Sequence, residues 1–263
     1  MDFVKVAAES LYELAALDYA KNYFICYTLN NQQAYECAYR FGGSDDPIIG
    51  VFLRKTGIVQ IAVKPGYTPD KCKVELEKLL SSIAWKQINA SGEVAKVIKS
   101  MSFQKIIYKG AIISKCLPDH FKVENKQNKL IFKMLTVDDL PEVVELYKTV
   151  FKGFATYQYM KEKLESGRGR ALGGYYKGML VTVAQTDYET CNSALIVGVA
   201  TLSEFQKKGY GRTCLEILCK PLIKQEKSLY LQYDAPHAGK LYSDLGFQII
   251  DNILLIKRKL NEV

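Results

Sequence analysis

A polar turn with two glycines separates an apolar run from an amphipathic run in residues 195–220 (LIVGVATLSEFQKKGYGRTCLEILCK). Its centre is the hexapeptide QKKGYG at residues 206–211. Glycine allows a sharp backbone turn and leaves no Cβ between a ligand and the amides. At the start of a helix those amides point outward, and the positive end of the helix dipole favours an anion. The pattern predicts a phosphate or pyrophosphate cradle, with an ordinary strand-to-helix turn as the alternative.

The spacing of the glycines separates three kinds of phosphate-binding turn. A P-loop requires GxxxxGK followed by Ser or Thr, which the chain does not contain, and a dinucleotide turn requires a third glycine where Cys214 stands. The pattern that fits is Q/R-x-x-G-x-G/A, and here the chain resembles the GNAT superfamily of N-acetyltransferases. Residues 199–205 (VATLSEF) are similar to the family's fourth strand, and residues 241–247 (LYSDLGF) are similar to its LYxxxGF segment.

The resemblance implies a fold, a reaction and a cosubstrate. It implies transfer of an acetyl group from acetyl-coenzyme A to a primary amine, by direct attack in a ternary complex and without a metal. The main chain of Val199, Ala200 and Thr201 would lie beside the pantetheine arm. The pyrophosphate would be held by the turn that follows, through Gln206, Lys207, Lys208, Gly209, Tyr210, Gly211 and Arg212. The family more often has arginine where this chain has Gln206, a difference of one charge.

The reaction needs a proton donor for the departing thiolate. A coenzyme thiol has a pKa near 8.5, so a phenol with a pKa near 10 is still protonated and can donate. Tyr242 is our candidate, because it stands four residues before Gly246, where the family's motif has its general-acid tyrosine. The alternative is a core tyrosine that packs under a short helix.

The group that removes the proton from the amine is not identified by a motif. Histone-acetylating members of the family carry a glutamate about eleven residues before the motif, where this chain has Leu195. Glu204 reads as a solvated turn residue. Asp234 and His237 follow an expected strand, and His237 could relay a proton because its usual pKa lies near neutrality. Water that passes protons to bulk solvent is an equal alternative.

Composition limits the partners and the compartment. A chain of 263 residues with 48% hydrophobic residues can bury one large or two modest cores. The net charge of +8 favours anionic ligands, but no nucleic-acid-binding motif accompanies it, so we expect none bound. Seven cysteines without a CxxC pair indicate reduced thiols. Since no signal-like start or long apolar run occurs, we expect a cytoplasmic protein that does not enter membranes. We also expect a monomer or homodimer, and an acceptor that is a small molecule.

Apolar periodicity predicts the same order of elements in both halves of the chain. The order is helix, helix, three strands, helix, strand, helix and strand pair. In the first half helices are expected at 2–17 and 18–29, and an antiparallel meander of three strands at 33–41, 48–54 and 58–63. A helix at 70–82, a strand at 83–88, a helix at 92–100 and a strand pair at 104–115, bent at Gly110, follow.

In the second half a strand at 131–134 comes first, and helices at 136–151 and 156–166 follow, with Thr136 and Asp139 suited to a capping box. Strands come next at 172–176, 179–187 and 193–201, with Lys177-Gly178 as the hairpin turn between the first two. The helix after the cradle should stop near Pro221, and a strand at 229–233, a helix at 236–245 and a strand pair at 247–259 complete the half. We infer an internal duplication, although an α+β chain could produce this order without one.

The duplication predicts an α+β fold of two tandem GNAT-like domains, each a mixed, mostly antiparallel sheet flanked by helices. We expect residues 1–117 to form a domain without a cradle, because Pro65 and Pro69 remove two amide donors from its turn. Residues 118–129 would be a linker, and residues 130–263 the acetyltransferase domain. We expect the first half to close over the acceptor side of the cleft and shape substrate choice.

Two other classes of function stay open. A non-catalytic acyl-coenzyme A sensor or scaffold with a GNAT fold would share the cradle, and the absence of a carboxylate at Leu195 suits it. A nucleotide-dependent enzyme would need a different phosphate loop, and tight ATP or NAD binding would favour it. The identity of the acceptor lies beyond any motif in the chain.

Overall fold

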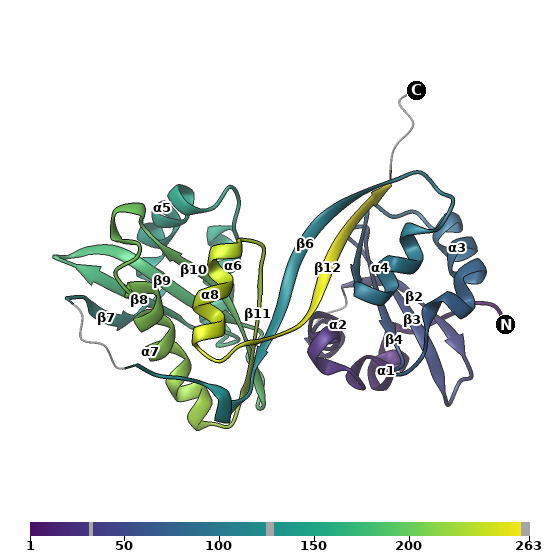
Figure 1. The fold of residues 1–263 in the computed structure, drawn as a ribbon, viewed down its shortest axis with the longest axis horizontal. Helices are drawn as coiled ribbons and strands as arrows, with labels where there is room; N and C mark the ends of the chain where they lie inside the picture. The colour runs from purple at the N-terminus through teal and green to yellow at the C-terminus, as the bar shows by residue number, and fades with distance from the viewer. Residues whose placement is uncertain (32–33, 125–128, 259–263) are drawn as a thin grey trace. The chain divides into compact units, whose positions relative to one another are not determined.

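The chain forms two compact units in a computed structural model that describes residues 1–31, 34–124 and 129–258 (Figure 1). Unit 1 contains residues 1–113 and the chain from Ile250 onward, and unit 2 contains residues 114–249. The chain passes from one unit to the other within a strand at residue 113, and it returns within another strand at residue 249.

Unit 1 is a sheet with helices on both faces. Its elements are β1 (Val4–Val6), α1 (Tyr12–Ala16), α2 (Tyr19–Asn31), β2 (Tyr35–Gly42), β3 (Pro47–Arg54), β4 (Ile58–Val63), α3 (Lys73–Ser82), β5 (Gln87–Ser91), α4 (Gly92–Lys99), β6 (Lys105–Cys116) and β12 (Gln248–Arg258). The strand order is β1-β2-β3-β4-β5-β12-β6. The strands β2, β3 and β4 form the predicted antiparallel meander, and β4 pairs with β5 in parallel.

Alternating side chains of β3 separate two cores in unit 1. Val51 packs with residues of α3 and α4, such as Leu76 and Ile98. Its neighbour Phe52 points to the other face, where it packs with Leu14 of α1. This alternation follows from the two-residue period of a strand, so an apolar strand between two helical layers has no polar face.

Unit 2 has the same construction. Its elements are β7 (Ile131–Met134), α5 (Leu140–Val150), α6 (Tyr157–Glu165), β8 (Ala171–Tyr176), β9 (Met179–Asp187), β10 (Ser193–Thr201), α7 (Tyr210–Lys224), β11 (Ser228–Tyr233) and α8 (Pro236–Asp244). The strand order is β11-β10-β9-β8-β7, and β10 pairs with β11 in parallel while the other pairs are antiparallel. The helices α5 and α6 share a core with one face of the sheet, and α7 and α8 share a core with the other.

The predicted repeat of element order is confirmed. In both units two helices precede three antiparallel strands, and then a helix, a parallel strand and a further helix follow. The units differ at the third strand of the meander. The pairing of β4 with β3 is regular, whereas the pairing of β10 with β9 shifts register between Val197 and Ala200, which marks a β-bulge.

Several predicted elements differ from the structure. Residues 2–17 were expected to be one helix, but they contain β1, a 3₁₀ turn at Ala8–Leu11 and the short α1. The strand expected at 83–88 lies at Gln87–Ser91. Proline was expected to stop the helix near Pro221, yet α7 continues to Lys224. The proline removes one donor near the helix end, on the side of the half-exposed Ile217, so the carbonyl left behind can reach solvent.

The two expected strand pairs are single strands. Residues 104–115 were expected to bend at Gly110, but β6 is continuous from Lys105 to Cys116. A Cβ placed on Gly110 would lie 2.2 Å from the carbonyl oxygen of Ile253 in β12, so this glycine permits a close approach of two strands. Likewise β12 is one strand from Gln248 to Arg258, where a pair was expected at 247–259.

The predicted domain boundaries are corrected at the end of the second domain. Residues 130–263 were expected to belong together, but from Ile250 the chain is part of unit 1. There β12 pairs with β5 through Ile253↔Ser91 to Lys257↔Gln87. Periodicity identifies a strand but not its neighbour, so the sequence could not show this exchange. The expected linker at 118–129 begins with a 3₁₀ turn at Pro118–His120, and its residues 125–128 lie outside the described part.

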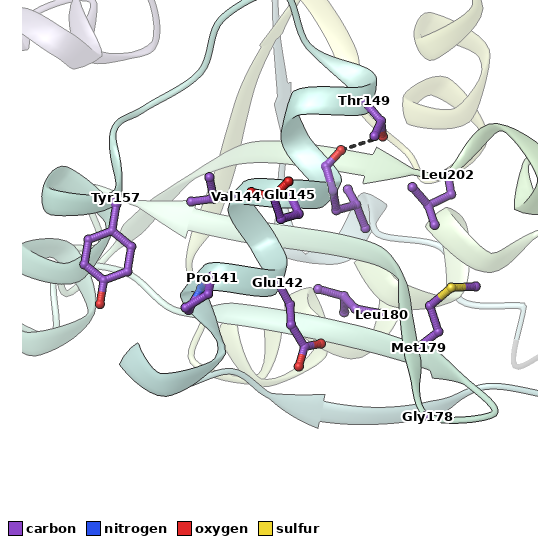
Figure 2. A pocket seen from close by; sticks show the side chains of 11 residues that line it. Pro141, Glu142, Val144, Glu145, Thr149, Tyr157, Gly178, Met179, Leu180 and Leu202 are labelled. Carbon is purple, nitrogen blue, oxygen red and sulfur yellow. Dashed lines mark hydrogen bonds between the residues drawn. The ribbon is translucent and has the colours of Figure 1, made fainter.

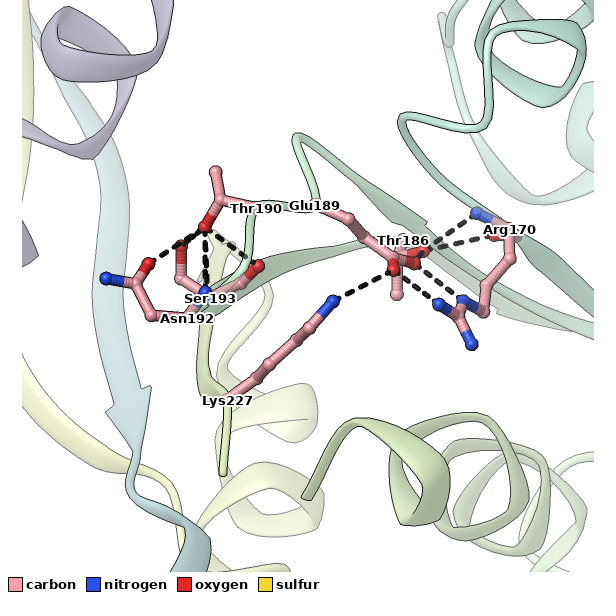
Figure 3. Close-up of polar contacts among 7 residues, drawn as sticks. All are labelled: Arg170, Thr186, Glu189, Thr190, Asn192, Ser193 and Lys227. Carbon is pink, nitrogen blue, oxygen red and sulfur yellow. Dashed lines mark hydrogen bonds and ion pairs between the residues drawn. The ribbon is translucent and has the colours of Figure 1, made fainter. Parts of the chain in front are cut away.

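A buried ionic cluster joins the strands of unit 2 at one end (Figure 3). The carboxylate of Glu189, in the β9–β10 connection, accepts two hydrogen bonds from the Arg170 guanidinium at 2.8 and 2.6 Å. It also accepts one from the Thr186 hydroxyl and forms an ion pair with Lys227 at 3.7 Å. Arg170 immediately precedes β8 and Lys227 immediately precedes β11, so the cluster links the starts of these strands. We call this the closed end of the β10–β11 pair, because the two strands are paired here and diverge after Ile196.

Among the helices within the described residues, none combines the length and the apolar character needed to cross a bilayer. All seven cysteines are unpaired thiols, and Cys191 is the exposed one.

Replacement of Glu189 by glutamine should destabilise unit 2 by about 2 kcal/mol. The change leaves two cations without a carboxylate, and we place the cost below the 3–5 kcal/mol range for buried pairs because the Arg170 side chain is 33% exposed. Hydrogen exchange of the β10 amides measures the effect within unit 2. Glu93→Gln is the control, because Glu93 pairs with Lys96 at the surface. Equal effects of the two changes would contradict this role of the cluster.

Deletion of the chain from Ile250 onward should expose the β5 edge of the unit 1 sheet, although the deleted residues come last in the sequence. The amides of residues 87–91 should then lose hydrogen-exchange protection, because β12 is their neighbour on that side. The pairs between β2 and β3 serve as the internal control and should stay protected. Unchanged protection of β5 would contradict the strand order.

Candidate functional site

The predicted cradle is an outward-facing row of main-chain amides. Gly209 has φ +81° and caps α7, and Lys207 also has a positive φ of 59°. Within the described part of the chain, no acceptor receives a hydrogen bond from the N–H groups of residues 207–212. The next amide, of Thr213, donates to the Gly209 carbonyl at 3.0 Å. The start of a 15-residue helix therefore presents its donors and its positive dipole end to solvent.

The cationic side chains around the cradle differ in what they contact. Lys207 is exposed. Lys208 folds back, and its ammonium donates to the Glu204 carbonyl at 2.7 Å. Arg212 was expected to add charge to the cradle, but its side chain is 13% exposed and forms ion pairs with Glu216 at 2.8 Å and Glu124 at 3.2 Å. Its guanidinium is thus neutralised by carboxylates, while its amide remains in the row.

The side chain of Gln206 contacts the end of β10. Its amide nitrogen donates to the Thr201 carbonyl at 3.0 Å, which draws the turn back onto the end of β10. Gly211 lies against the same residue, because a Cβ there would be 3.1 Å from the Thr201 hydroxyl. The turn is therefore fixed to the strand by a side-chain hydrogen bond and a close contact, and neither requires a charge.

The strand that precedes the cradle separates from β11. Parallel pairing runs from Ser193↔Ser228 to Ile196↔Leu231 and then stops, although β10 continues to Thr201. On its other side β10 stays paired with β9, through Ala200↔Val183 and Thr201↔Thr182. The predicted coenzyme-binding residues 199–201 thus lie on a strand with an unpaired edge, as a ligand that adds to the strand would require.

Sequence reasoning missed Gly198 and Tyr147. Gly198 lies in the bulge with φ +58°, and its carbonyl accepts a hydrogen bond from the Tyr147 hydroxyl at 2.7 Å. A glycine inside an apolar strand pattern is a signal for a bulge or a close approach. Tyr147, which lies on α5, has no such signal, because a tyrosine at a helical core position looks like ordinary packing.

Tyr242 lies on α8 and is 8% exposed. Its ring packs 5.3 Å from that of Tyr233 and 6.0 Å from that of Phe247. Burial raises the pKa of Tyr242 to about 12, so the phenol is protonated at neutral pH. It lines a hollow of about 340 Å³ together with Ser114, Tyr233, Gly239, Ser243, Phe247, Gln248 and Ile249.

The residues considered as a base do not converge on a single side chain. Leu195 is buried in β10. Glu204 is exposed, and its pKa is lowered by backbone and Ser203 hydrogen bonds, which suits a solvated turn residue. Asp234 is exposed after β11, and the side chain of His237 lies outside what the structure describes. Among the described residues, no cluster of three or more His, Cys, Asp or Glu is placed to hold a metal ion.

A larger hollow of about 800 Å³ lies along α5 (Figure 2). Its lining is mainly apolar and includes Val144, Leu146, Leu180 and Leu202, with Glu142 among the polar residues. None of the predicted site residues lines it. We therefore place the candidate site at the cradle and the unpaired edge of β10, and not in this larger hollow.

The corresponding turn of unit 1 is built differently. Between β4 and α3, Pro65 and Pro69 supply no N–H, and the Tyr67 amide donates to the Lys64 carbonyl at 3.0 Å. The Lys64 ammonium bonds to Asp46 at 2.5 Å. Of these two turns, only the one between β10 and α7 therefore presents a row of unbonded amides to an anion.

Comparison with known proteins gives matches among solved structures. No protein-family model and no curated protein sequence matches the chain. A GCN5-related N-acetyltransferase from Sphaerobacter thermophilus is 12% identical, with a TM-score of 0.68 over 97% of this chain and 95% of that one. A GNAT-family acetyltransferase from Colwellia psychrerythraea is 13% identical, with a TM-score of 0.64 over 98% of this chain and 100% of that one.

A tandem GNAT protein from the clavulanic acid biosynthesis pathway is similar over 98% of both chains, with 12% identity and a TM-score of 0.64. At such identities the likeness concerns the fold, and it extends over nearly the whole chain in all three cases. Together with the repeated element order, it shows that this protein has the GNAT fold, present twice in tandem.

Proposed function

We propose that the protein is an N-acetyltransferase whose unit 2 binds acetyl-coenzyme A and transfers the acetyl group to a primary amine in a ternary complex. The observation that carries the proposal is the row of unbonded amides at residues 207–212, beside a strand whose edge is unpaired. The GNAT fold of the structural neighbours supports the same reaction class. The acceptor is most simply a small molecule.

In the proposed complex the pyrophosphate accepts hydrogen bonds from the amides of residues 207–212. The pantetheine arm lies along the unpaired edge of β10, where it replaces the missing strand with its own amide groups. The exposed ammonium of Lys207 lies next to the amides and attracts the phosphates of the coenzyme. The cradle therefore holds the anionic half of the ligand, and the strand directs the thioester half.

In the proposed reaction the neutral amine attacks the thioester carbonyl carbon, and the carbon–sulfur bond breaks as the new carbon–nitrogen bond forms. The amine proton leaves to water, the thiolate takes a proton from the Tyr242 hydroxyl, and the Tyr242 phenolate then recovers a proton from water. Because burial holds the pKa of Tyr242 at about 12, the phenol remains a donor throughout the pH range in which the amine becomes neutral.

Gly209→Asp should weaken coenzyme A binding about tenfold more than Gly209→Asn. Both residues tolerate the left-handed backbone and have the same shape, so the difference isolates one negative charge beside the amides. Isothermal titration with coenzyme A measures the two affinities. The difference should shrink between about 50 mM and 500 mM salt, because the interaction is screened. Equal binding by both variants would contradict an anion site at the cradle.

Tyr242→Phe should lower kcat about 100-fold while coenzyme A binding stays unchanged, since the change removes the proposed acid without altering the cradle. Thiol release from acetyl-coenzyme A, tested against a panel of amines, measures turnover. Tyr233→Phe is the matched control, because it removes a hydroxyl from the neighbouring ring. If both variants turn over like the unmodified protein, the acid role of Tyr242 is wrong.

A non-catalytic coenzyme A sensor is the second candidate function, and the burial of Tyr242 between two aromatic rings favours it. A sensor would be stabilised by acetyl-coenzyme A in a thermal shift experiment and would release no thiol with any amine of the panel. An acetyltransferase would show both the stabilisation and the release.

A further inference from the structure

A continuous chain of buried hydrogen bonds leads from a lysine to the bulge of β10. The Lys163 ammonium donates to the Gln185 side-chain oxygen. The Gln185 amide nitrogen donates to the Tyr147 hydroxyl at 2.7 Å, and this hydroxyl donates to the Gly198 carbonyl at 2.7 Å. Lys163 is 1% exposed, Tyr147 is 3% exposed and Gln185 is fully buried. This series of hydrogen bonds links α6, β9, α5 and β10 through buried side chains.

The lysine fixes the direction of every hydrogen bond in this chain. Burial lowers the pKa of Lys163 to about 8, so at neutral pH the group is mainly an ammonium, which can only donate. The oxygen of Gln185 must then face Lys163, and its NH₂ group must face Tyr147. The Tyr147 oxygen then accepts from Gln185, and its own proton is left for Gly198. Nearby charges on Asp187, Glu189 and Arg168 act on Lys163, but its direct bond is to the amide.

Gly198, at the end of this series of hydrogen bonds, has no room for a side chain. A Cβ at this position would lie 2.3 Å from the Tyr147 oxygen and 2.8 Å from the ring of Phe154. The two rings lie 4.3 Å apart. Glycine is also the residue that adopts φ +58° at little cost. The bulge at Gly198 therefore packs directly against the Tyr147 hydroxyl and the Phe154 ring.

The bulge lies just beyond the point at which β10 stops pairing with β11. Register passes from Val197↔Gln185 to Ala200↔Val183, so β10 has one residue more than β9 across this interval. A bulge of this kind bends its strand and increases its twist. Pairing with β11 has ended one residue earlier, at Ile196. The Tyr147–Gly198 bond holds the bent segment from the α5 side, away from the unpaired edge.

We propose that Tyr147 is a positioning residue for the pantetheine arm, which acts by holding the Gly198 carbonyl and so the edge of β10 along which the arm lies, and that Gln185 and Lys163 orient its hydroxyl. The proposal rests on the proposed function, because it assumes that coenzyme A binds at this edge. Tyr147 itself does not touch the reacting atoms in this arrangement.

The test compares two ligands that share the cradle. One is coenzyme A, and the other is 3′-phosphoadenosine 5′-diphosphate, which is coenzyme A without its pantetheine arm. Both are titrated calorimetrically into the full chain at a temperature at which circular dichroism shows each variant to be folded. The ratio of the two affinities measures the contribution of the arm, and the nucleotide affinity alone reports the cradle.

Tyr147→Phe should weaken coenzyme A binding about fivefold to tenfold, the effect of one lost hydrogen bond, and change nucleotide binding by less than about twofold. Tyr159→Phe is the matched control, because it removes a tyrosine hydroxyl in the same unit that bonds to Asp187 at 2.6 Å and not to β10. The control should bind both ligands like the unmodified protein, even if its melting temperature falls.

Gln185→Glu tests the same idea without removing an atom from Tyr147. The new carboxylate can only accept, so it accepts the hydrogen bond of the Tyr147 hydroxyl and leaves the Gly198 carbonyl without its donor, while Lys163 balances its charge. It should reproduce the loss for coenzyme A and spare the nucleotide. This variant also decides the matter if Tyr147→Phe does not fold.

Three results would overturn the inference. They are folded variants that bind coenzyme A like the unmodified protein, an equal weakening of binding for both ligands, and the same selective loss in Tyr159→Phe. Failure of the unmodified protein to bind either ligand would instead refute the proposed function, and the inference with it. Binding of the nucleotide without any gain from the arm would refute the inference and leave the cradle in place.

Discussion

The pairing of β10 with β11 ends at Ile196, and the candidate site of unit 2 depends on this divergence of the two strands. At the closed end of the pair, the Glu189 cluster holds the strand starts together with charges that are largely removed from water. At the open end, a bulge at Gly198 turns β10 away, and the turn after Thr201 begins α7 with unbonded amides. A strand edge and a helix start both leave main-chain donors without partners, and here the two occur within a few residues of each other.

Unit 1 shows what the same layout becomes without the bulge and the open turn, although its β4 also continues to Val63 after its pairing with β5 ends at Gln60↔Asn89. Its β4 is regular against β3, with no shift of register. Its turn contains two prolines and is closed by hydrogen bonds of its own. Within β4, the Gln60 side-chain oxygen accepts a hydrogen bond from the Tyr35 hydroxyl at 3.0 Å. A repeated fold therefore need not repeat a site, because the site depends on a bulge and a turn that core packing does not require.

The sequence predicted what local chemistry determines. Glycine spacing predicted the sharp turn before α7, where Gly209 has φ +81°, and the Lys177-Gly178 pair gave the β8–β9 hairpin, with φ of 49° and 85°. Thr136 with Asp139 forms the expected capping box. It could not predict relations between distant segments. The exchange of β12 into unit 1 depends on which edge a strand joins, and Gly110 was misread because its neighbour Ile253 is far away in sequence. The ion pair of the Arg212 guanidinium with Glu124 likewise joins distant segments and cannot be read from spacing.

The central claim is that the main-chain amides of residues 207–212 bind the pyrophosphate of coenzyme A. A nitrogen-15 NMR titration with coenzyme A tests it most directly, because each amide reports on its own hydrogen bond. We predict large, saturable shifts for residues 207–212 and for the strand residues 199–201, with no comparable shifts in residues 64–71 of unit 1. Saturable binding that leaves the 207–212 amides unshifted, or the absence of any saturable shift, would contradict the account.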